Sequence, residues 1–168
     1  MRDMIKESLK TLGDALLFEI LIAILIVVLM LRNLKVSFLI SGLMPLAVLF
    51  VFIAMKFFKV EANIVALSGI AIAIGTMVDM GIILLENVVR HQKKSPKFSV
   101  EKTVLNATRE VSGAILTAGL TTIVSFIPVF ALSGAEGKLF APLAFTKTVA
   151  LSAAILISLF ILPPIASL

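Results

Sequence analysis

The sequence predicts an all-α membrane protein, a polytopic helix bundle of about five transmembrane helices plus one amphipathic cytoplasmic helix. Of its 168 residues, 60% are hydrophobic, and the mean hydropathy is +1.16. Charged residues make up only 15% of the chain, whereas about 25% is usual in a soluble domain. The apolar residues gather in runs close to the ~20 residues with which an α-helix crosses a bilayer.

Five apolar runs are the predicted transmembrane helices. The first contains Glu19, the second is broken only by Pro45, and the third contains Asp79 and Glu86. Because the turn at 133–137 is short, we expect the fourth and fifth helices to form an antiparallel hairpin. The five runs are residues 16–33, 36–56, 62–89, 111–132 and 138–164.

The polar stretch 90–110 separates the third run from the fourth. Within it, Ser99 is a suitable helix N-cap, and Val100, Val104 and Val111 recur at helical spacing. We therefore predict an amphipathic surface helix over 99–110 that runs into the fourth transmembrane helix.

The distribution of Lys and Arg predicts the orientation. The 32–35 turn and the 90–110 stretch hold eight of the 15 Lys and Arg, whereas the 56–61 and 133–138 turns hold three. Because these residues collect on the cytoplasmic side, we expect 90–110 in the cytoplasm and residues 1–15 outside. An exported N-terminus without a signal peptide leads us to expect an earlier span and an exported domain, and hence an excised or split fragment.

Composition narrows the classes of function. Without Cys the sequence offers neither disulfides nor thiolate metal sites, and a single histidine, His91, cannot supply a cluster of nitrogen ligands. A net charge of +5 more often reports loop orientation than nucleic-acid binding in a membrane protein, and the basic-aromatic surface that nucleic acid requires is missing. We expect the lipid bilayer, and no nucleic acid, as a partner.

Asp79 is the predicted site of chemistry. It lies 15 residues after Ile64 and 11 before Arg90, or about 22 Å and about 16 Å at ~1.5 Å per residue. An ionised Asp near the middle of a bilayer costs at least about 2.5 kcal/mol, and such acids are usually functional. It must face protein or water, or hold a proton, which favours a proton-coupled transporter. The alternative is a structural hydrogen-bond partner.

The residues around Asp79 recur at helical spacing and predict its surroundings. The small-residue pairs Gly69–Ala73 and Ala71–Gly75 allow helices to approach closely, so we expect Asp79 to face a tight helix interface. Glu86, two turns further, is a candidate second relay site, or else an interfacial residue that reaches the cytoplasmic surface. The predicted stripe is Ser68, Ile72, Gly75, Asp79, Ile82 and Glu86.

Two further residues are candidates for the site. Lys147 lies about 13 Å deep in the fifth span and is either a charge partner of Asp79 or a cation that reaches the outer interface. Met77 lies beside Asp79 and carries a thioether, a ligand that suits soft metal ions. Scattered Met in an apolar helix is more often packing.

Two long stretches resemble the resistance-nodulation-division superfamily of efflux pumps, and most closely its heavy-metal branch. They are ANIVALSGIAIAIGTMVDMGIILLENVV and SFIPVFALSGAEGKLFAPLAFTKT, with the pattern G-x-x-V-D-x-x-I-x-x-x-E-N and the string F-x-P-L-A-F-T-K-T. The resemblance covers essentially the whole chain and matches its spans to helices 2 to 6 of the family's transmembrane domain.

The resemblance implies a secondary active transporter, not an enzyme: a proton-driven antiporter of heavy-metal cations in the bacterial inner membrane. It implies no bound cofactor, only protons and a transported cation. The full-length pump would be a homotrimer working with a periplasmic adaptor and an outer-membrane channel. A second half would follow Leu168 and supply the relay lysine, and the N-terminus of this chain would be periplasmic.

The resemblance also assigns individual residues. Asp79 matches the relay acid of the fourth helix, and Met80 stands where the multidrug branch has a second acid, which favours the metal branch. Met77 occupies one position of the methionine pairs of copper and silver members, but Val65 and Leu151 stand where others are expected. A cobalt, zinc, nickel or cadmium substrate is therefore an equal expectation.

Other functions remain as alternatives. Besides a segment of a metal pump, the chain could belong to a non-metal member of the superfamily, one that handles drugs or lipids or assists secretion. A third alternative is a structural fragment that does not transport. An intramembrane aspartyl protease needs two catalytic aspartates, one in a G-x-G-D setting. This chain has one intramembrane Asp, preceded by Thr-Met-Val.

Overall fold

The computed structural model describes residues 2–31, 34–94 and 99–167, and every element in these ranges is helical. The predicted all-α class is therefore confirmed. The elements are α1 (Arg2–Leu31), α2 (Leu34–Phe57), α3 (Ile64–Lys94), α4 (Val100–Phe126), η1 (Ile127–Ala131), α5 (Gly134–Leu156), η2 (Ile157–Ile161) and α6 (Leu162–Ala166).

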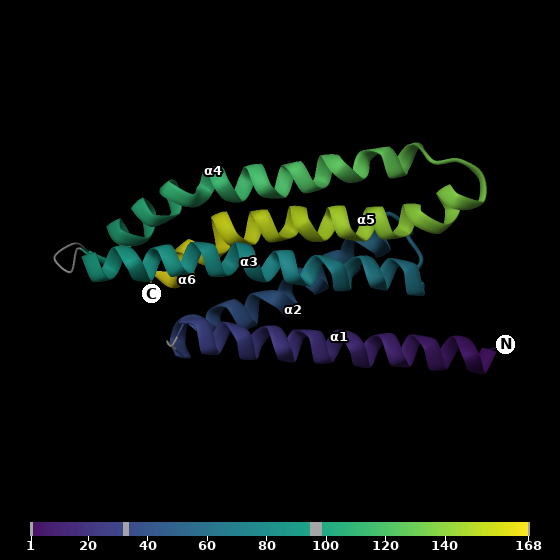
Figure 1. The fold of residues 1–168 in the computed structure, drawn as a ribbon, viewed down its shortest axis with the longest axis horizontal. Helices are drawn as coiled ribbons and strands as arrows, with labels where there is room; N and C mark the ends of the chain where they lie inside the picture. The colour runs from purple at the N-terminus through teal and green to yellow at the C-terminus, as the bar shows by residue number, and fades with distance from the viewer. Residues whose placement is uncertain (1, 32–33, 95–98, 168) are drawn as a thin grey trace.

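The long helices lie along one common direction, with α3 in the middle of the bundle (Figure 1). α5 packs along α3, α4 lies on one side of this pair, and α1 with α2 lies on the other. The N-terminus and the start of α5 are at one end of the bundle, and the C-terminus and the end of α3 are at the other. The predicted connections thus alternate between the two ends, while the assignment of either end to the cytoplasm stays a prediction.

Three helices of the described chain are long and apolar enough to cross a membrane: Ile64–Lys94, Val100–Ala131 and Gly134–Ala166. They match the third, fourth and fifth predicted runs to within two residues at each end that falls outside them. The described residues of the first two runs fall within α1 and α2, and Pro45–Phe57 of α2 is a shorter apolar helix. Residues 32–33 of the first run and 95–98 of the polar stretch lie outside the described residues, and the count of five spans stays a prediction.

The start of α4 follows the predicted capping pattern. The Ser99 hydroxyl accepts a hydrogen bond from the backbone N–H of Lys102 at 3.4 Å, which satisfies one of the free donors of the first turn. From Val100 the helix continues without a break to Phe126. The polar segment before residue 111 and the apolar run after it are therefore one continuous helix.

Prolines change the geometry of the later helices. α4 gives way at Ile127 to the 3₁₀ helix η1, which contains Pro128, because proline lacks the N–H that an α-helix needs. Before Pro163 and Pro164 comes the π-helical turn η2, in which the Leu162 N–H donates to the Ile157 carbonyl. Since proline is tolerated in the first turn of a helix, α6 continues through both prolines and ends at Ala166.

α3 and α5 approach each other closely at Ala66, Gly69, Leu143 and Thr146. Ala66 and Thr146 are fully buried. A Cβ added at Gly69 would meet the Thr146 hydroxyl and, at 2.7 Å, the carbonyl oxygen of Leu143. Only glycine permits this approach, as at other small-residue interfaces between membrane helices. We call these four residues the α3–α5 crossing.

Candidate functional site

Asp79 lies on a face of α3 that stays exposed in the bundle. The helical repeat of 3.6 residues aligns the exposed positions of α3 between Ile72 and Arg90 into a single stripe, about 27 Å long at ~1.5 Å per residue. Both acids of the third span belong to this stripe, whereas the rest of α3 is largely buried. The exposed stripe comprises Ile72, Gly75, Asp79, Ile83, Glu86 and Arg90.

This arrangement corrects the expectation that Asp79 faces a tight interface within the chain. The close approach occurs at Gly69, whereas a Cβ added at Gly75 would meet no atom within 4 Å. Ile82 of the predicted stripe is buried, and Ile83 takes its place on the exposed face. Helical spacing predicts which residues share a face, but packing decides which face finds a partner.

Glu86 lies two turns beyond Asp79 on the exposed stripe, about 10 Å along the helix axis. It borders a pocket of about 280 Å³ between α3 and α4, together with Ile83, Asn87, Arg90 and Val111. This pocket is large enough to hold water, and three of its lining side chains are polar. The second acid of the stripe therefore lies among polar side chains.

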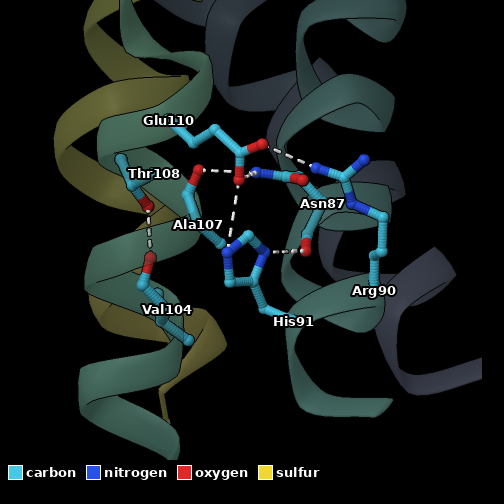
Figure 2. A network of polar contacts seen from close by, with 7 residues as sticks. All are labelled: Asn87, Arg90, His91, Val104, Ala107, Thr108 and Glu110. Carbon is cyan, nitrogen blue, oxygen red and sulfur yellow. Dashed lines mark hydrogen bonds and ion pairs between the residues drawn. The ribbon is translucent and has the colours of Figure 1, made fainter. Parts of the chain in front are cut away.

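Next to this pocket, the Glu110 side chain joins α4 to the end of α3 (Figure 2). Its Oε1 lies 2.7 Å from Arg90 Nη2, and its Oε2 lies 3.2 Å from both Asn87 Nδ2 and His91 Nε2. Asn87 Nδ2 also donates to the carbonyl of Ala107 at 2.8 Å, and His91 Nδ1 lies 3.1 Å from the carbonyl oxygen of Asn87. We call Asn87, Arg90, His91 and Glu110 the Glu110 cluster.

The Glu110 carboxylate lies one residue before the predicted fourth span, which begins at residue 111. The hydrogen bond from Asn87 is the main cause that holds the pKa of this carboxyl below its ordinary value. The charges of Arg90 and His91 also lower this pKa, whereas partial desolvation of the carboxyl raises it. Glu110 is therefore ionised at neutral pH and binds the end of α3 as an anion.

The Lys147 side chain packs against an aromatic ring of α4. Its ammonium lies 4.2 Å from the centroid of the Phe126 ring, a cation–π contact with the last residue of α4. Within the described part of the chain, no ion pair joins Lys147 to Asp79. The side chain is instead directed toward the end of the bundle where α4 and α5 are connected.

Comparison with known proteins identifies the family. The model of the AcrB/AcrD/AcrF family matches residues 2–168. The chain belongs to this family. The predicted resemblance to resistance-nodulation-division efflux pumps is thereby confirmed, and the named relatives agree with the heavy-metal branch.

The relatives within the AcrB/AcrD/AcrF family include proteins named for cation efflux. The cation efflux system protein CusA of Escherichia coli O157:H7 is 35% identical over 169 residues, and the cobalt-zinc-cadmium resistance protein CzcA of Cupriavidus metallidurans is 29% identical over 168. A crystal structure of a heavy metal efflux pump is similar at a TM-score of 0.83, with 27% identity over 96% of this chain. The chain spans 16% of the length of each of the three.

The position of Met77 is relevant to the prediction that this residue binds a metal ion. Met77 and Met80 are buried among apolar side chains of the core, on the packed side of α3, whereas Asp79 is on the exposed stripe. Across residues 2–31, 34–94 and 99–167, no group of three or more His, Cys, Asp or Glu residues could hold a metal ion. A role for Met77 as a metal ligand stays a prediction.

Sequence reasoning missed two residues of this family member, Glu110 and Thr146. Glu110 is the last residue of the predicted surface helix, and an antiparallel arrangement of α3 and α4 brings it opposite Asn87. That pairing depends on the register of the two helices, which sequence periodicity does not report. Thr146 belongs to the F-T-K-T string, but nothing in the string indicates that its hydroxyl reaches another helix.

The Glu110 cluster leads to a stability prediction. Replacing Asn87 by Ala removes two hydrogen bonds and leaves the Ala107 carbonyl without its side-chain donor. We therefore expect the free energy of unfolding to decrease by about 1–3 kcal/mol. The measurement is the thermal unfolding midpoint of the purified protein in detergent. Asn106→Ala is the control, because Asn106 is exposed on the same helix as Glu110. An equal decrease in both variants would contradict the prediction.

Proposed function

We propose that this chain is part of the transmembrane domain of a proton-driven antiporter that exports heavy-metal cations, and that Asp79 carries the proton. The observation that supports the proposal most directly is the exposed stripe of α3. A carboxylate near the middle of an apolar helix is placed on the exposed face of the bundle, in line with a second carboxylate that borders a polar pocket. The names of the relatives support the class of cargo.

The proposed chemistry is the uptake and release of one proton by a carboxylate. The ionised form of Asp79 requires water or a cation beside it, whereas the protonated form is neutral and tolerates apolar neighbours. Protonation therefore changes what can pack against the exposed stripe. This gives a physical route by which proton binding favours one arrangement of the membrane helices over another.

We propose that the remaining helices of a longer pump cover the exposed stripe and bring a basic group to Asp79. We further propose a homotrimer in the bacterial inner membrane, acting with a periplasmic adaptor and an outer-membrane channel. Residues 1–15 would be periplasmic and residues 90–110 cytoplasmic. The length of the relatives, of which this chain spans 16%, supports the proposal that further helices belong to the pump.

The experiment that tests this function is ion flux in proteoliposomes that contain the full-length protein. If the proposal is correct, a proton gradient drives accumulation of a divalent or monovalent heavy-metal cation, and adding the cation causes counterflow of protons. Collapsing the gradient with a protonophore should stop accumulation. Cation movement that is indifferent to the proton gradient would contradict the proposal.

Glu86 is proposed as a secondary relay site. Because it borders a polar pocket, water can replace part of its function, so we expect Glu86→Gln to lower proton-coupled flux by no more than about tenfold, below the usual range for a required acid–base group. Flux is measured in the same proteoliposomes. The matched control is Glu101→Gln, which changes an exposed acid in the first turn of α4. A complete loss in Glu86→Gln would show that Glu86 is required and not secondary.

A further inference from the structure

The hydroxyl of Thr146 forms a hydrogen bond between two membrane helices. Thr146 is fully buried, and its Oγ1 donates to the carbonyl oxygen of Ala66 at 2.8 Å, between positions 80 residues apart. Next to this bond, Gly69 leaves no room for a side chain between α3 and α5. The hydroxyl therefore lies where the two helices are too close for a side chain at position 69.

This hydroxyl has other acceptors within its own helix. The carbonyl oxygens of Pro142 and Leu143 lie 3.0 and 3.1 Å from Oγ1. Threonine in a helix commonly donates to such carbonyls, and one hydroxyl has a single proton to donate. The distance to the Ala66 carbonyl oxygen is the shortest of the three. The hydroxyl therefore links α5 to α3, although acceptors within α5 are also in reach.

The position of this bond matters for Asp79. α3 is one unbroken helix from Ile64 to Lys94, and Asp79 follows Ala66 by 13 residues, about 20 Å along the axis. Rotating α3 by about 20° would move a carboxylate that lies ~6 Å from the helix axis by about 2 Å. An error of 1 Å in placing a reacting group can lower a rate by about 10²-fold.

We propose that Thr146 is a positioning residue for the proton relay. Its hydroxyl sets the rotation of α3 on α5 at the α3–α5 crossing, and thereby sets the direction in which the Asp79 carboxylate points. The proposal rests on the proposed function of Asp79. It assigns a role to the F-T-K-T string that is separate from Lys147, whose ammonium lies over Phe126.

The chain supplies its own control for this proposal. The Oγ1 atom of Thr148, two residues further along α5, is buried and has no hydrogen-bond partner in the described part of the protein. Thr146→Val and Thr148→Val therefore make the same change of hydroxyl to methyl in the same helix. Only the first removes a bond between helices. Thr146→Ser keeps the hydroxyl and tests whether that group is sufficient.

The test measures metal-driven proton flux of the full-length protein in proteoliposomes from acid to mildly alkaline pH. We expect Thr146→Val to lower the flux about tenfold, because the Asp79 carboxylate would be displaced by a fraction of 1 Å. We also expect the pH profile of the flux to shift. Thr146→Ser should keep the wild-type profile and at least about a third of the flux. Thr148→Val should have the wild-type flux and the wild-type pH profile. The folded amount and the unfolding midpoint are recorded for every variant.

Two results would overturn the proposal. One is wild-type flux in Thr146→Val, and the other is a loss that only follows the amount of folded protein, with an unchanged pH profile. If Thr146→Val does not fold, Thr146→Cys replaces it, because a thiol is a similar-sized but weak donor. The displaced profile is then expected in Thr146→Cys, and an unchanged profile overturns the proposal.

The same assay separates this proposal from the proposed function. If Asp79→Asn transports normally, the relay function itself fails. If Asp79→Asn is inactive while Thr146→Val has wild-type flux and a wild-type pH profile, only the role of Thr146 fails.

Discussion

Replacing Asp79 by Asn is expected to lower metal-driven proton flux in the full-length protein by at least about 10²-fold, the lower end of what a positioned proton donor or acceptor contributes. Asn has nearly the same size but cannot bind or release a proton at this position. Because Asp79 is exposed and takes part in no ion pair within the described residues, the packing of α1 to α6 should not depend on its charge. The variant should therefore reach wild-type abundance and lose transport.

The control for Asp79→Asn is Glu136→Gln, which removes an exposed carboxylate from the first turn of α5. Both changes convert an acid into its amide on a long helix, but only one lies on the exposed stripe. We expect Glu136→Gln to keep wild-type flux. Proton-coupled transport at the wild-type rate in Asp79→Asn would exclude this residue as the carrier of the proton.

Gly69→Ala is expected to destabilise the protein by about 1–3 kcal/mol, the usual cost of overpacking a core. The added Cβ would lie 2.7 Å from the Leu143 carbonyl oxygen and would also meet the Thr146 hydroxyl. A backbone atom cannot move aside as the end of a flexible side chain can, so α3 and α5 would have to separate. The measurement is the unfolding midpoint in detergent, together with the amount of folded protein in membranes.

Gly113→Ala is the matched control for Gly69→Ala, because a Cβ at Gly113 of α4 would meet no atom within 4 Å. In an open position, Ala is favoured over Gly in a helix by up to about 1 kcal/mol. The same substitution should therefore have opposite signs at the two positions. A stabilising Gly69→Ala would show that the α3–α5 crossing is not as close as the structure has it.

Several features could be predicted because they depend on local sequence. The apolar runs predicted long helices where α1 to α5 occur, and Ser99 predicted the start of α4. The depth of Asp79 along α3 followed from counting residues, since a helix rises by a constant ~1.5 Å per residue. The family followed from two long motifs and is confirmed by the match over residues 2–168.

Other features could not be predicted because they depend on how one helix is rotated against another. The small-residue pairs of α3 correctly indicated close packing at Gly69, but the same pattern led us to place Asp79 in a tight interface. Lys147 could reach toward Asp79 by depth alone, yet its ammonium lies over Phe126. Depth along a helix is a one-dimensional quantity, whereas contact also requires the correct face.

The sequence alone therefore determined the membrane class, the approximate helices and the presence of an acid deep within one of them. The tertiary structure decided that Asp79 and Glu86 share the exposed stripe, that Glu110 joins α4 to the end of α3, and that Thr146 reaches Ala66. The physical reason is that hydropathy and helical periodicity are properties of a single segment. The rotation and register of packed helices arise from side chains distant in sequence, and only their contacts determine which groups meet.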